Sequence, residues 1–339
     1  MGPRVTVLII SIDTEEDNWS PSRDAVSLAN IRELPRLARF FERLGVRPTY
    51  LVNYQVAINP SACGVLRDVT AQRSNAEIGA HLHPWNTPPL DEAFVPRNSM
   101  LRNLSADLQR AKLGRLTDAL ADAFDARPLV FRAGRFGVGP ETIGALLDCG
   151  YRVDSSVTPF WSWQSYDDGP SFVGAPIGVY RLARGGDVRQ PTPGGELIEI
   201  PLSYGFSSGP FSVWDPTRRL LEKPPLRWLR LAGIVERTGL ARRIVLCPEL
   251  ASADDMLTLS RRLLEHGARH LQIFFHSPSL TPGLSPFVTS QAEVGRLYDT
   301  IEAYIDGVSR LTDVRFATIS EAASLLAPRE GPAATRASA

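Results

Sequence analysis

Two carboxylates follow the first apolar stretch of the chain. Residues 5–12 form an apolar, largely β-branched run that predicts a strand buried on both faces, as in a parallel sheet. Asp13 and Glu15 come directly after it, and side chains two apart on an extended segment point the same way. We therefore expect both carboxylates to face one pocket. Glu16 and Asp17 are interpreted as a solvated acidic loop, because runs of charge are usually exposed.

Two histidines provide nitrogen ligands for the same pocket. The chain has five histidines, and His81 and His83 lie two apart at the end of a strand-like segment, 76–80. Two imidazoles and one carboxylate suffice for a catalytic zinc-type site that leaves one position for water. The sequence thus predicts one bound divalent ion. Zn is the expected metal, with Co, Ni, Mn and Fe(II) as alternatives that this set of ligands does not distinguish.

An arginine and a third histidine follow two other predicted strands. Arg132 comes after Val130 and Phe131, where a buried guanidinium would orient a carboxylate and hold it ionised. His276 ends the strand-like run 271–275 and could donate a proton to a leaving group. A surface cation remains the alternative for Arg132, and a core histidine for His276.

The elements that must position these residues alternate along the chain. Helical spacing of apolar residues predicts helices, and short apolar runs predict strands, in the order expected of a parallel barrel with its site at the carboxyl ends of the strands. Helices are expected at 28–44, 105–124, 141–149, 253–266, 291–309 and 320–326. Further strands are expected at 49–52, 151–155 and 314–317.

These strings together resemble the NodB-type polysaccharide deacetylases, carbohydrate esterase family four. The motifs that carry the resemblance are Ile12-Asp13-Thr14-Glu15, the segment from Glu77 to Pro84, Phe131-Arg132 and His276-Ser277. It spans residues 5 to 326, and the greatest similarity is to a branch associated with lipopolysaccharide and other surface-glycan biosynthesis. The resemblance implies a distorted α/β barrel of about seven strands.

The resemblance also implies roles for individual residues. Asp13 would be the catalytic base and Glu15 a metal ligand, although family members usually carry two adjacent aspartates. His81 and His83 would be the other ligands, with a spacing of two where the family usually has four. The Arg-x-Pro-Tyr motif of the family keeps only its arginine, Arg132, which puts contacts to the substrate in doubt more than the chemistry.

Residues 1–327 are expected to form one domain, with two irregular segments near the site. The segment 158–215 is interpreted as an insertion or lid in which 179–182 and 197–204 pair as a hairpin over the site. A Pro-rich loop at 278–288 should line the pocket, and the tail at 328–339 should be disordered.

Several further residues are candidates for contacts around the site. Asp154, at another predicted strand end, could pair with Arg132 or His276 from outside the ligand set. The aromatic candidates for a saccharide platform, which could equally be core residues, are Trp85, Trp161 and Trp163. Arg135 is a surface cation or a substrate contact.

Composition restricts the class of protein. The chain has 339 residues, 43% of them hydrophobic and 22% charged, which fits one large α/β domain. The 37 basic and 37 acidic residues balance, so nothing indicates binding to nucleic acid or to an anionic membrane. Three distant cysteines argue for reduced, buried thiols, and the amino-terminal apolar run is too short for a signal peptide or membrane span. We expect a cytoplasmic protein without membrane insertion.

The expected activity is metal-dependent hydrolysis of an N-acetyl group from an amino sugar. In a cytoplasmic enzyme the substrate would be a biosynthetic saccharide, a lipid-linked saccharide or a glycosylated small molecule. Hydrolysis of another C–N amide, by a deformylase or ureide hydrolase, is the first alternative. The second is a sugar-binding barrel without catalysis, which the altered histidine spacing motivates.

Overall fold

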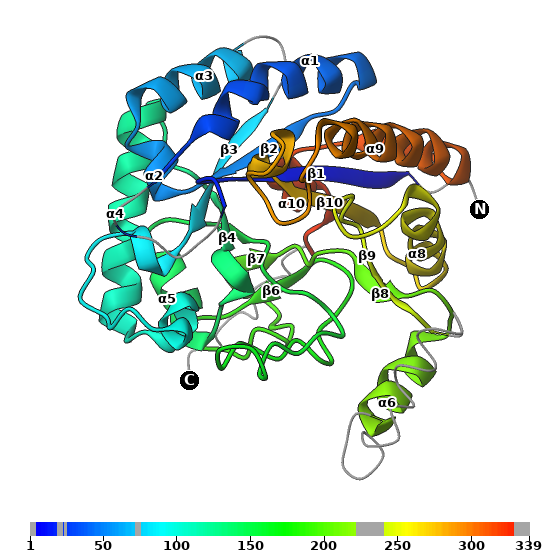
Figure 1. Cartoon of the computed structure of the whole chain (residues 1–339). Coiled ribbons are helices and arrows are strands. Elements are labelled where there is room, and N and C mark those ends of the chain that lie inside the picture. The colour runs from blue at the N-terminus through cyan, green and yellow to red at the C-terminus, as the bar shows by residue number, and fades with distance from the viewer. Residues whose placement is uncertain (1–4, 19–22, 24–25, 72–75, 222–240, 329–339) are drawn as a thin grey trace, which may run out of the picture.

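The computed structural model describes residues 5–18, 23, 26–71, 76–221 and 241–328. A curved sheet of nine strands lies at its centre, with helices around the outside (Figure 1). The strands of this sheet are β1 (Thr6–Thr14), β2 (Pro48–Val52), β3 (Glu77–Leu82), β4 (Val130–Ala133), β5 (Val153–Asp154), β6 (Tyr180–Leu182), β7 (Leu197–Glu199), β10 (His270–His276) and β11 (Val314–Phe316). A separate pair consists of β8 (Tyr204–Phe206) and β9 (Arg243–Val245).

The order of the strands is that of an open, distorted barrel. It runs β10-β1-β2-β3-β4-β5-β7-β6, and β11 pairs with the beginning of β1. All neighbours from β10 to β7 are parallel, and only β6 runs antiparallel to its partner. The carboxyl ends of these parallel strands therefore meet at one edge. The predicted α/β class and distorted barrel are confirmed.

Most of the helices pack around the main sheet, whereas α6 extends away from it (Figure 1). The α-helices are α1 (Leu34–Leu44), α2 (Tyr54–Ala57), α3 (Pro60–Ala71), α4 (Ala106–Phe124), α5 (Pro140–Asp148), α6 (Phe211–Leu221), α8 (Ala253–Glu265), α9 (Gln291–Leu311) and α10 (Ile319–Leu326). Short 3₁₀ turns are found at Ala29–Glu33, Pro84–Asn86, Pro96–Ser99, Leu101–Asn103, Gly134–Phe136 and Ser277–Leu280. Four helices are capped by side-chain oxygens, those of Ser105, Ser252, Ser290 and Thr318.

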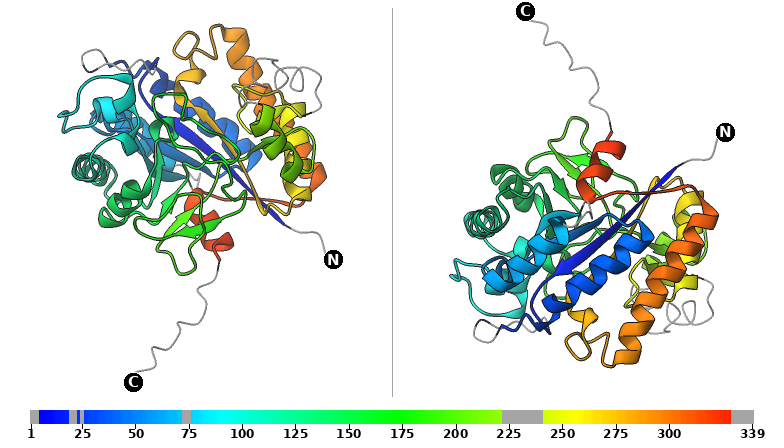
Figure 2. Two further views of the ribbon diagram at one scale, coloured as in Figure 1. Left: turned by 90° about the horizontal axis from the view of Figure 1, so that it is seen from below. Right: turned by 90° about the horizontal axis from the view of Figure 1, so that it is seen from above.

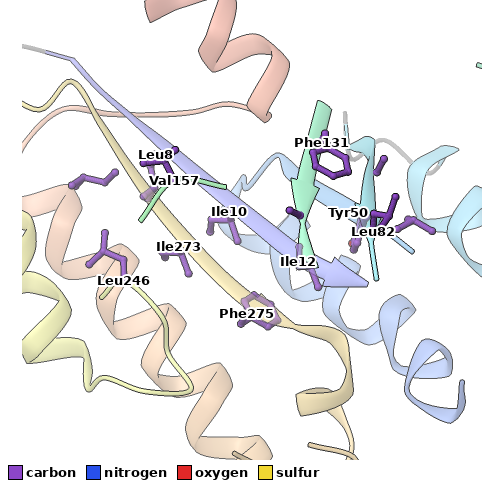
Figure 3. Close-up of a cluster of buried hydrophobic side chains, with 14 of the residues drawn as sticks. Leu8, Ile10, Ile12, Tyr50, Leu82, Phe131, Val157, Leu246, Ile273 and Phe275 are labelled. Atoms are coloured by element: carbon purple, nitrogen blue, oxygen red, sulfur yellow. The ribbon is translucent and has the colours of Figure 1, made fainter. Parts of the chain in front are cut away.

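Alternation along β1 separates two cores. Leu8, Ile10 and Ile12 point to the helix side, where they pack in the large cluster shown in Figure 3. Val7 and Ile9 point into the barrel and belong to a smaller cluster, to which α10 also contributes side chains. Because the period is two, Ser11 and Asp13 continue this inner row toward the carboxyl edge. The apolar row thus ends in a polar one at the height of the site.

Figure 2 shows how the helices are distributed around this sheet. Helices α1, α3 and α9 lie together on one side, and α10 lies at the end where β1 begins. Within the described residues, no helix is both long and apolar enough to cross a membrane.

The segment 158–215 differs in part from its prediction. Its hairpin forms, since β6 and β7 pair antiparallel, but β7 also pairs with β5 and so extends the main sheet. Tyr204 belongs to β8 instead of the hairpin. Trp163, Tyr166 and Tyr204 are the residues of this segment that line the pocket, and none of them belongs to the β6–β7 hairpin. Except for Pro328, the predicted tail 328–339 lies outside the described residues.

Close packing between strands gives a first prediction. A Cβ atom at Gly79, in β3, would lie 2.7 Å from Leu51 Cδ2 and 3.2 Å from the Val130 carbonyl oxygen. Gly79→Ala should therefore lower the free energy of unfolding by about 1–3 kcal/mol, measured by urea denaturation. Gly114→Ala is the matched control, because nothing lies within 4 Å of its added Cβ atom in α4. The control should gain about 0.5–1 kcal/mol, and equal effects of the two changes would contradict this packing.

Candidate metal centre and active site

Three ligand atoms converge at the carboxyl edge of the sheet. Glu15 Oε2 lies 3.0 Å from His83 Nε2 and 3.3 Å from His81 Nε2, and the two Nε2 atoms are 3.0 Å apart. All three side chains are buried. Ligand atoms about 2.0–2.2 Å from a shared ion stand roughly this far from one another. Among the described residues, these three form the group of acidic, histidine or cysteine side chains suited to a metal ion.

Neighbouring strands explain this convergence. Glu15 follows the last residue of β1, His81 lies in β3, and His83 follows the end of β3. Strand β2 lies between β1 and β3. Its residue Val52 is paired with Thr14 of β1 on one side and with Ala80 of β3 on the other. The histidine spacing of two places both imidazoles on the same side of β3, as the sequence predicts.

Each imidazole is held from behind by an acceptor. His81 Nδ1 lies 3.1 Å from the carbonyl oxygen of Arg132, and His83 Nδ1 lies 3.0 Å from Glu16 Oε1. Such contacts fix the ring so that Nε2 faces the ion and raise its basicity. Trp85 adds a stacked ring on His83, with centroids 4.2 Å apart. The geometry therefore fits a metal site that is oriented before binding.

The expectation of a solvated loop at Glu16 and Asp17 is wrong. Glu16 is 3% exposed and accepts hydrogen bonds from the side-chain amides of Asn53 and Asn86 besides its contact with His83. Asp17 is 7% exposed and accepts hydrogen bonds from Asn30 and from the Ser27 hydroxyl. Polar partners from distant segments form hydrogen bonds with both carboxylates and thereby offset the free-energy cost of burying them. Charge density along the sequence does not reveal such partners.

Electrostatics favour a positive charge among these ligands. Burial alone raises the pKa of Glu15, but the charge of His83 and hydrogen bonds from both imidazoles hold it well below its usual range. Burial likewise opposes protonation of His83, yet Glu16 and Glu15 raise its pKa to about 10. Two buried carboxylates thus share one positive partner. A divalent ion, with neutral imidazoles as ligands, can meet the same requirement.

Arg132 holds Asp13 beside the ligands. Its side chain has no exposed surface, and Nη1 donates to Asp13 Oδ1 at 2.7 Å. The rest of the guanidinium donates to the Ser155 carbonyl oxygen at 2.8 Å and to the Ser11 hydroxyl at 2.9 Å. Arg132 therefore lies where the sequence predicts, in contact with the carboxylate it was expected to orient.

His276 pairs with a carboxylate that the sequence analysis missed. Its Nδ1 donates to Glu249 Oε2 at 2.8 Å, and its Nε2 lies 3.8 Å from Asp13 Oδ2. The Ser279 hydroxyl donates to the other oxygen of Glu249. Burial opposes protonation of the imidazole, but Glu249, with smaller effects of Glu15 and Asp13, raises the pKa of His276 to about 9. This histidine is therefore protonated at neutral pH.

Asp154 does not make the contact expected of it. It accepts a hydrogen bond from the Ser156 hydroxyl at 2.6 Å, and its register neighbour on β7 is Glu199. Burial raises the pKa of both carboxyls, and the nearby charge of Asp154 raises that of Glu199 further. Asp154 therefore lies beside Glu199, and Ser155 supplies the contacts to Arg132.

The candidate residues surround one cavity of about 390 Å³. It is lined by Asp13, Glu15, Asn18, His81, His83, Trp85, Ala133, Arg135, Phe136, Trp163, Tyr166, Tyr204, Leu250, Phe274, His276 and Phe287. Trp85, Trp163 and Arg135 are thus placed at the pocket, as is Phe287 of the loop 278–288. Trp161 lies away from this lining, packed edge-on against Tyr204 and under the guanidinium of Arg243.

No family model matches the chain. No curated protein matches it either. Solved structures do, with low sequence identity. One from Mycobacterium smegmatis, described as a polysaccharide deacetylase, is 16% identical, with a TM-score of 0.52 over 96% of this chain and 91% of that chain. Another from Parabacteroides distasonis, described as a glycoside hydrolase/deacetylase, is 11% identical, with a TM-score of 0.59 over 96% of this chain and 71% of that chain.

The chain shares the fold of these two proteins. This likeness agrees with the fold that the sequence motifs imply.

A glycine behind His83 tests the geometry of the ligands. A Cβ atom at Gly134 would lie 2.5 Å from His83 Cδ2 and 2.7 Å from the Leu82 carbonyl oxygen. Gly134→Ala should displace the imidazole and weaken affinity for Zn²⁺ by about tenfold to a hundredfold, measured by competition with a chelating dye. Gly114→Ala serves again as the control and should bind as the wild type does. Unchanged affinity in Gly134→Ala would contradict ligation by His83.

The contact between Glu249 and His276 predicts a pH effect. Removing the charge in Glu249→Gln should lower the pKa of His276 toward its ordinary value, because Glu249 contributes most of the increase. If turnover at this site requires a protonated His276, any activity of the wild type falls only as pH rises through about 9. The fall should begin at least about one pH unit lower in Glu249→Gln. An alkaline limb at the same pH in both proteins would show that His276 is not the acid.

Proposed function

We propose that the chain is a divalent-metal-dependent deacetylase that hydrolyses the N-acetyl group of an amino sugar. One observation carries the proposal. A buried Glu15-His81-His83 group and two further ionisable side chains, Asp13 and His276, line the same cavity. A sugar-binding protein has no need of a carboxylate and an imidazole placed together beside a set of metal ligands.

Glu15, His81 and His83 would hold the ion. When bound, a divalent ion supplies Lewis-acid activation of the amide carbonyl and of water. Zn²⁺ is the proposed metal, and this mixture of imidazole and carboxylate also suits Co, Ni, Mn or Fe(II). The three residues are all within reach of one ion in their present positions.

Asp13 is the proposed general base. The hydrogen bond from Arg132 at 2.7 Å fixes one oxygen and leaves Oδ2 on the side of His276. The guanidinium orients the carboxylate, so that it can take a proton from the attacking water. Arg132 itself is sealed from the cavity and acts through Asp13.

His276 is the proposed general acid. Glu249 accepts from Nδ1, so the ring is held with Nε2 3.8 Å from Asp13 Oδ2, at the cavity. A pKa of about 9 keeps the imidazolium charged at neutral pH, ready to protonate the departing amine. The proposed base and acid thus lie next to each other at the cavity.

The proposed substrate is an N-acetylated saccharide or glycoconjugate precursor of a surface glycan, processed in the cytoplasm. Support comes from the sequence motifs and from the two structures of the same fold, both described as deacetylases. Trp163 at the cavity provides a flat apolar surface for a sugar ring. Residues 1–327 act as one catalytic domain in this proposal.

The test is release of acetate from N-acetylated amino sugars, with formate and ammonia assayed in parallel on formamides and ureides. Asp13→Asn and His276→Ala should retain bound metal but lose turnover by about a hundredfold or more each. Glu15→Ala should lose metal and turnover together. Trp161→Phe is the control, since Trp161 does not line the cavity.

Two outcomes would overturn the proposal. Formate or ammonia without acetate would identify a hydrolase of another amide. Loss of metal in Asp13→Asn with full retention in Glu15→Ala would reverse the roles of the two carboxylates.

A further inference from the structure

A second cavity of about 330 Å³ adjoins the proposed active site. Its lining is Trp85, Phe94, Val95, Pro96, Ser99, Arg135, Tyr166 and Asp167. Trp85, Arg135 and Tyr166 also line the catalytic cavity, so the two spaces share one wall. These three side chains therefore border both spaces, so a substrate that reaches past them would occupy both.

The shared wall is a stack of flat groups that begins at the metal centre. Trp85 stacks on His83, and the guanidinium of Arg135 lies 5.3 Å from the Trp85 ring and 5.4 Å from the Tyr166 ring. Arg135 adopts φ of 53°, in the left-handed region, and its ion-pair partner Asp167 also has φ of 53°. Left-handed backbone at residues with side chains is retained where surrounding contacts require it.

The loop 84–96, which carries Phe94, Val95 and Pro96 of this cavity, is bound to helix α4 through Lys112. Lys112 is fully buried in α4 and donates to the carbonyl oxygens of Pro84, Thr87 and Pro89 at 2.9, 2.7 and 2.6 Å. It also pairs with Glu92 at 3.0 Å. The loop that leads from His83 to the second cavity is therefore anchored at four points.

Arg23 attaches the same loop from the other side. Its guanidinium donates to the Trp85 carbonyl oxygen at 3.1 Å and to Glu92 Oε1 at 2.9 Å, and it lies 5.1 Å from the Phe94 ring. Pockets that bind small molecules are largely formed in advance, with apolar walls and few polar groups. The second cavity meets that description.

Arg135, Ser99 and Asp167 in this cavity satisfy one another, whereas the buried Nε1 of Trp85 has no hydrogen-bond partner among the described residues. Arg135 Nη1 donates to Ser99 Oγ at 2.9 Å and to Asp167 Oδ2 at 3.1 Å, and Ser99 donates to the Pro96 carbonyl oxygen at 2.5 Å. A second sugar ring would bring several hydroxyl groups and would need partners for them. An apolar group needs none, so the cavity is suited to it.

Large apolar side chains are exposed here. Phe94, Val95 and Tyr166 are 52%, 47% and 49% exposed, and Leu90 nearby in the same loop is 39% exposed. Contiguous exposed apolar surface at a cleft marks a binding site more often than a random surface does. Covering these side chains would be favourable by the area removed from water.

We propose that the second cavity binds an apolar aglycone attached to the N-acetylated amino sugar. The substrate would thus be an amphiphilic glycoside, with its sugar at the metal ligands and its aryl or alkyl group against Phe94, Val95 and Tyr166. This inference rests on the proposed function, whose substrate class it narrows.

The experiment compares kcat/KM for deacetylation of the methyl, phenyl and octyl glycosides of N-acetylglucosamine. Wild type should prefer the phenyl or octyl glycoside over the methyl glycoside by at least about tenfold, the equivalent of burying roughly two methylene groups. The double variant Phe94→Ser, Val95→Ser should lose that preference and keep its rate on the methyl glycoside. Leu129→Ser is the matched control, because Leu129 is 49% exposed and precedes β4 at the other end of the sheet.

Equal kcat/KM for the three glycosides in wild type would overturn the inference, and so would a preference that survives in the double variant. The relative activity of phenyl and octyl glycosides distinguishes an aryl from an alkyl group. Loss of binding to phosphatidylglycerol vesicles in the double variant, without any change in glycoside preference, would instead identify the apolar side chains as a lipid-docking surface.

A binding assay keeps this inference separable from the proposed function. If no glycoside is deacetylated, titration calorimetry with octyl β-glucoside and methyl β-glucoside tests the cavity alone. Tighter binding of the octyl compound by at least about tenfold, abolished in the double variant and retained in Leu129→Ser, supports the cavity even when deacetylation fails. Equal binding of both compounds overturns it.

Discussion

The buried guanidinium of Arg132 connects the parts of the site. It joins β4 to Asp13 and Ser11 on β1 and to Ser155 beyond β5, while the carbonyl oxygen of the same residue accepts from His81. An unpaired charge at this depth would be strongly destabilising, so the fold must supply these partners. The same contacts that neutralise the arginine therefore place the proposed base beside a metal ligand.

Register in the sheet makes this arrangement possible. β1 lies between β10 and β2, and its last residues stand opposite His276 on one side and Val52 on the other. Base, acid and ligands thus come from three regions of the sequence that meet only at the carboxyl edge. A shift of one residue in β1 would turn Ser11 and Asp13 out of the barrel and bring Ile12 in.

Much of this could be predicted because its signals are local. The apolar runs before Asp13, His81 and His276 marked strands, and each functional side chain comes at the end of one. The spacing of two at His81 and His83 likewise sufficed to place both rings together. Polarity at the end of a buried strand is a local signal for a site.

Other parts could not be predicted, because they depend on partners far away in sequence. Glu16 is buried through contacts with Asn53, Asn86 and His83. The acidic run at 15–17 gives no signal of these distant partners. Glu249 follows β9, whose three residues were too short to recognise as a strand. Asp154 was expected to pair with Arg132 or His276, but its neighbour is Glu199. These two residues meet because β5 pairs with β7, and a long stretch of chain separates the two strands in sequence.

The most direct test of the account is the metal content of the purified protein and of His83→Ala, measured by mass spectrometry after reconstitution with Zn²⁺. The account predicts about one ion per chain in the wild type and its loss in the variant, because three residues supply the whole ligand set. A wild type that binds no divalent ion, or a variant that binds it equally well, would contradict the central claim.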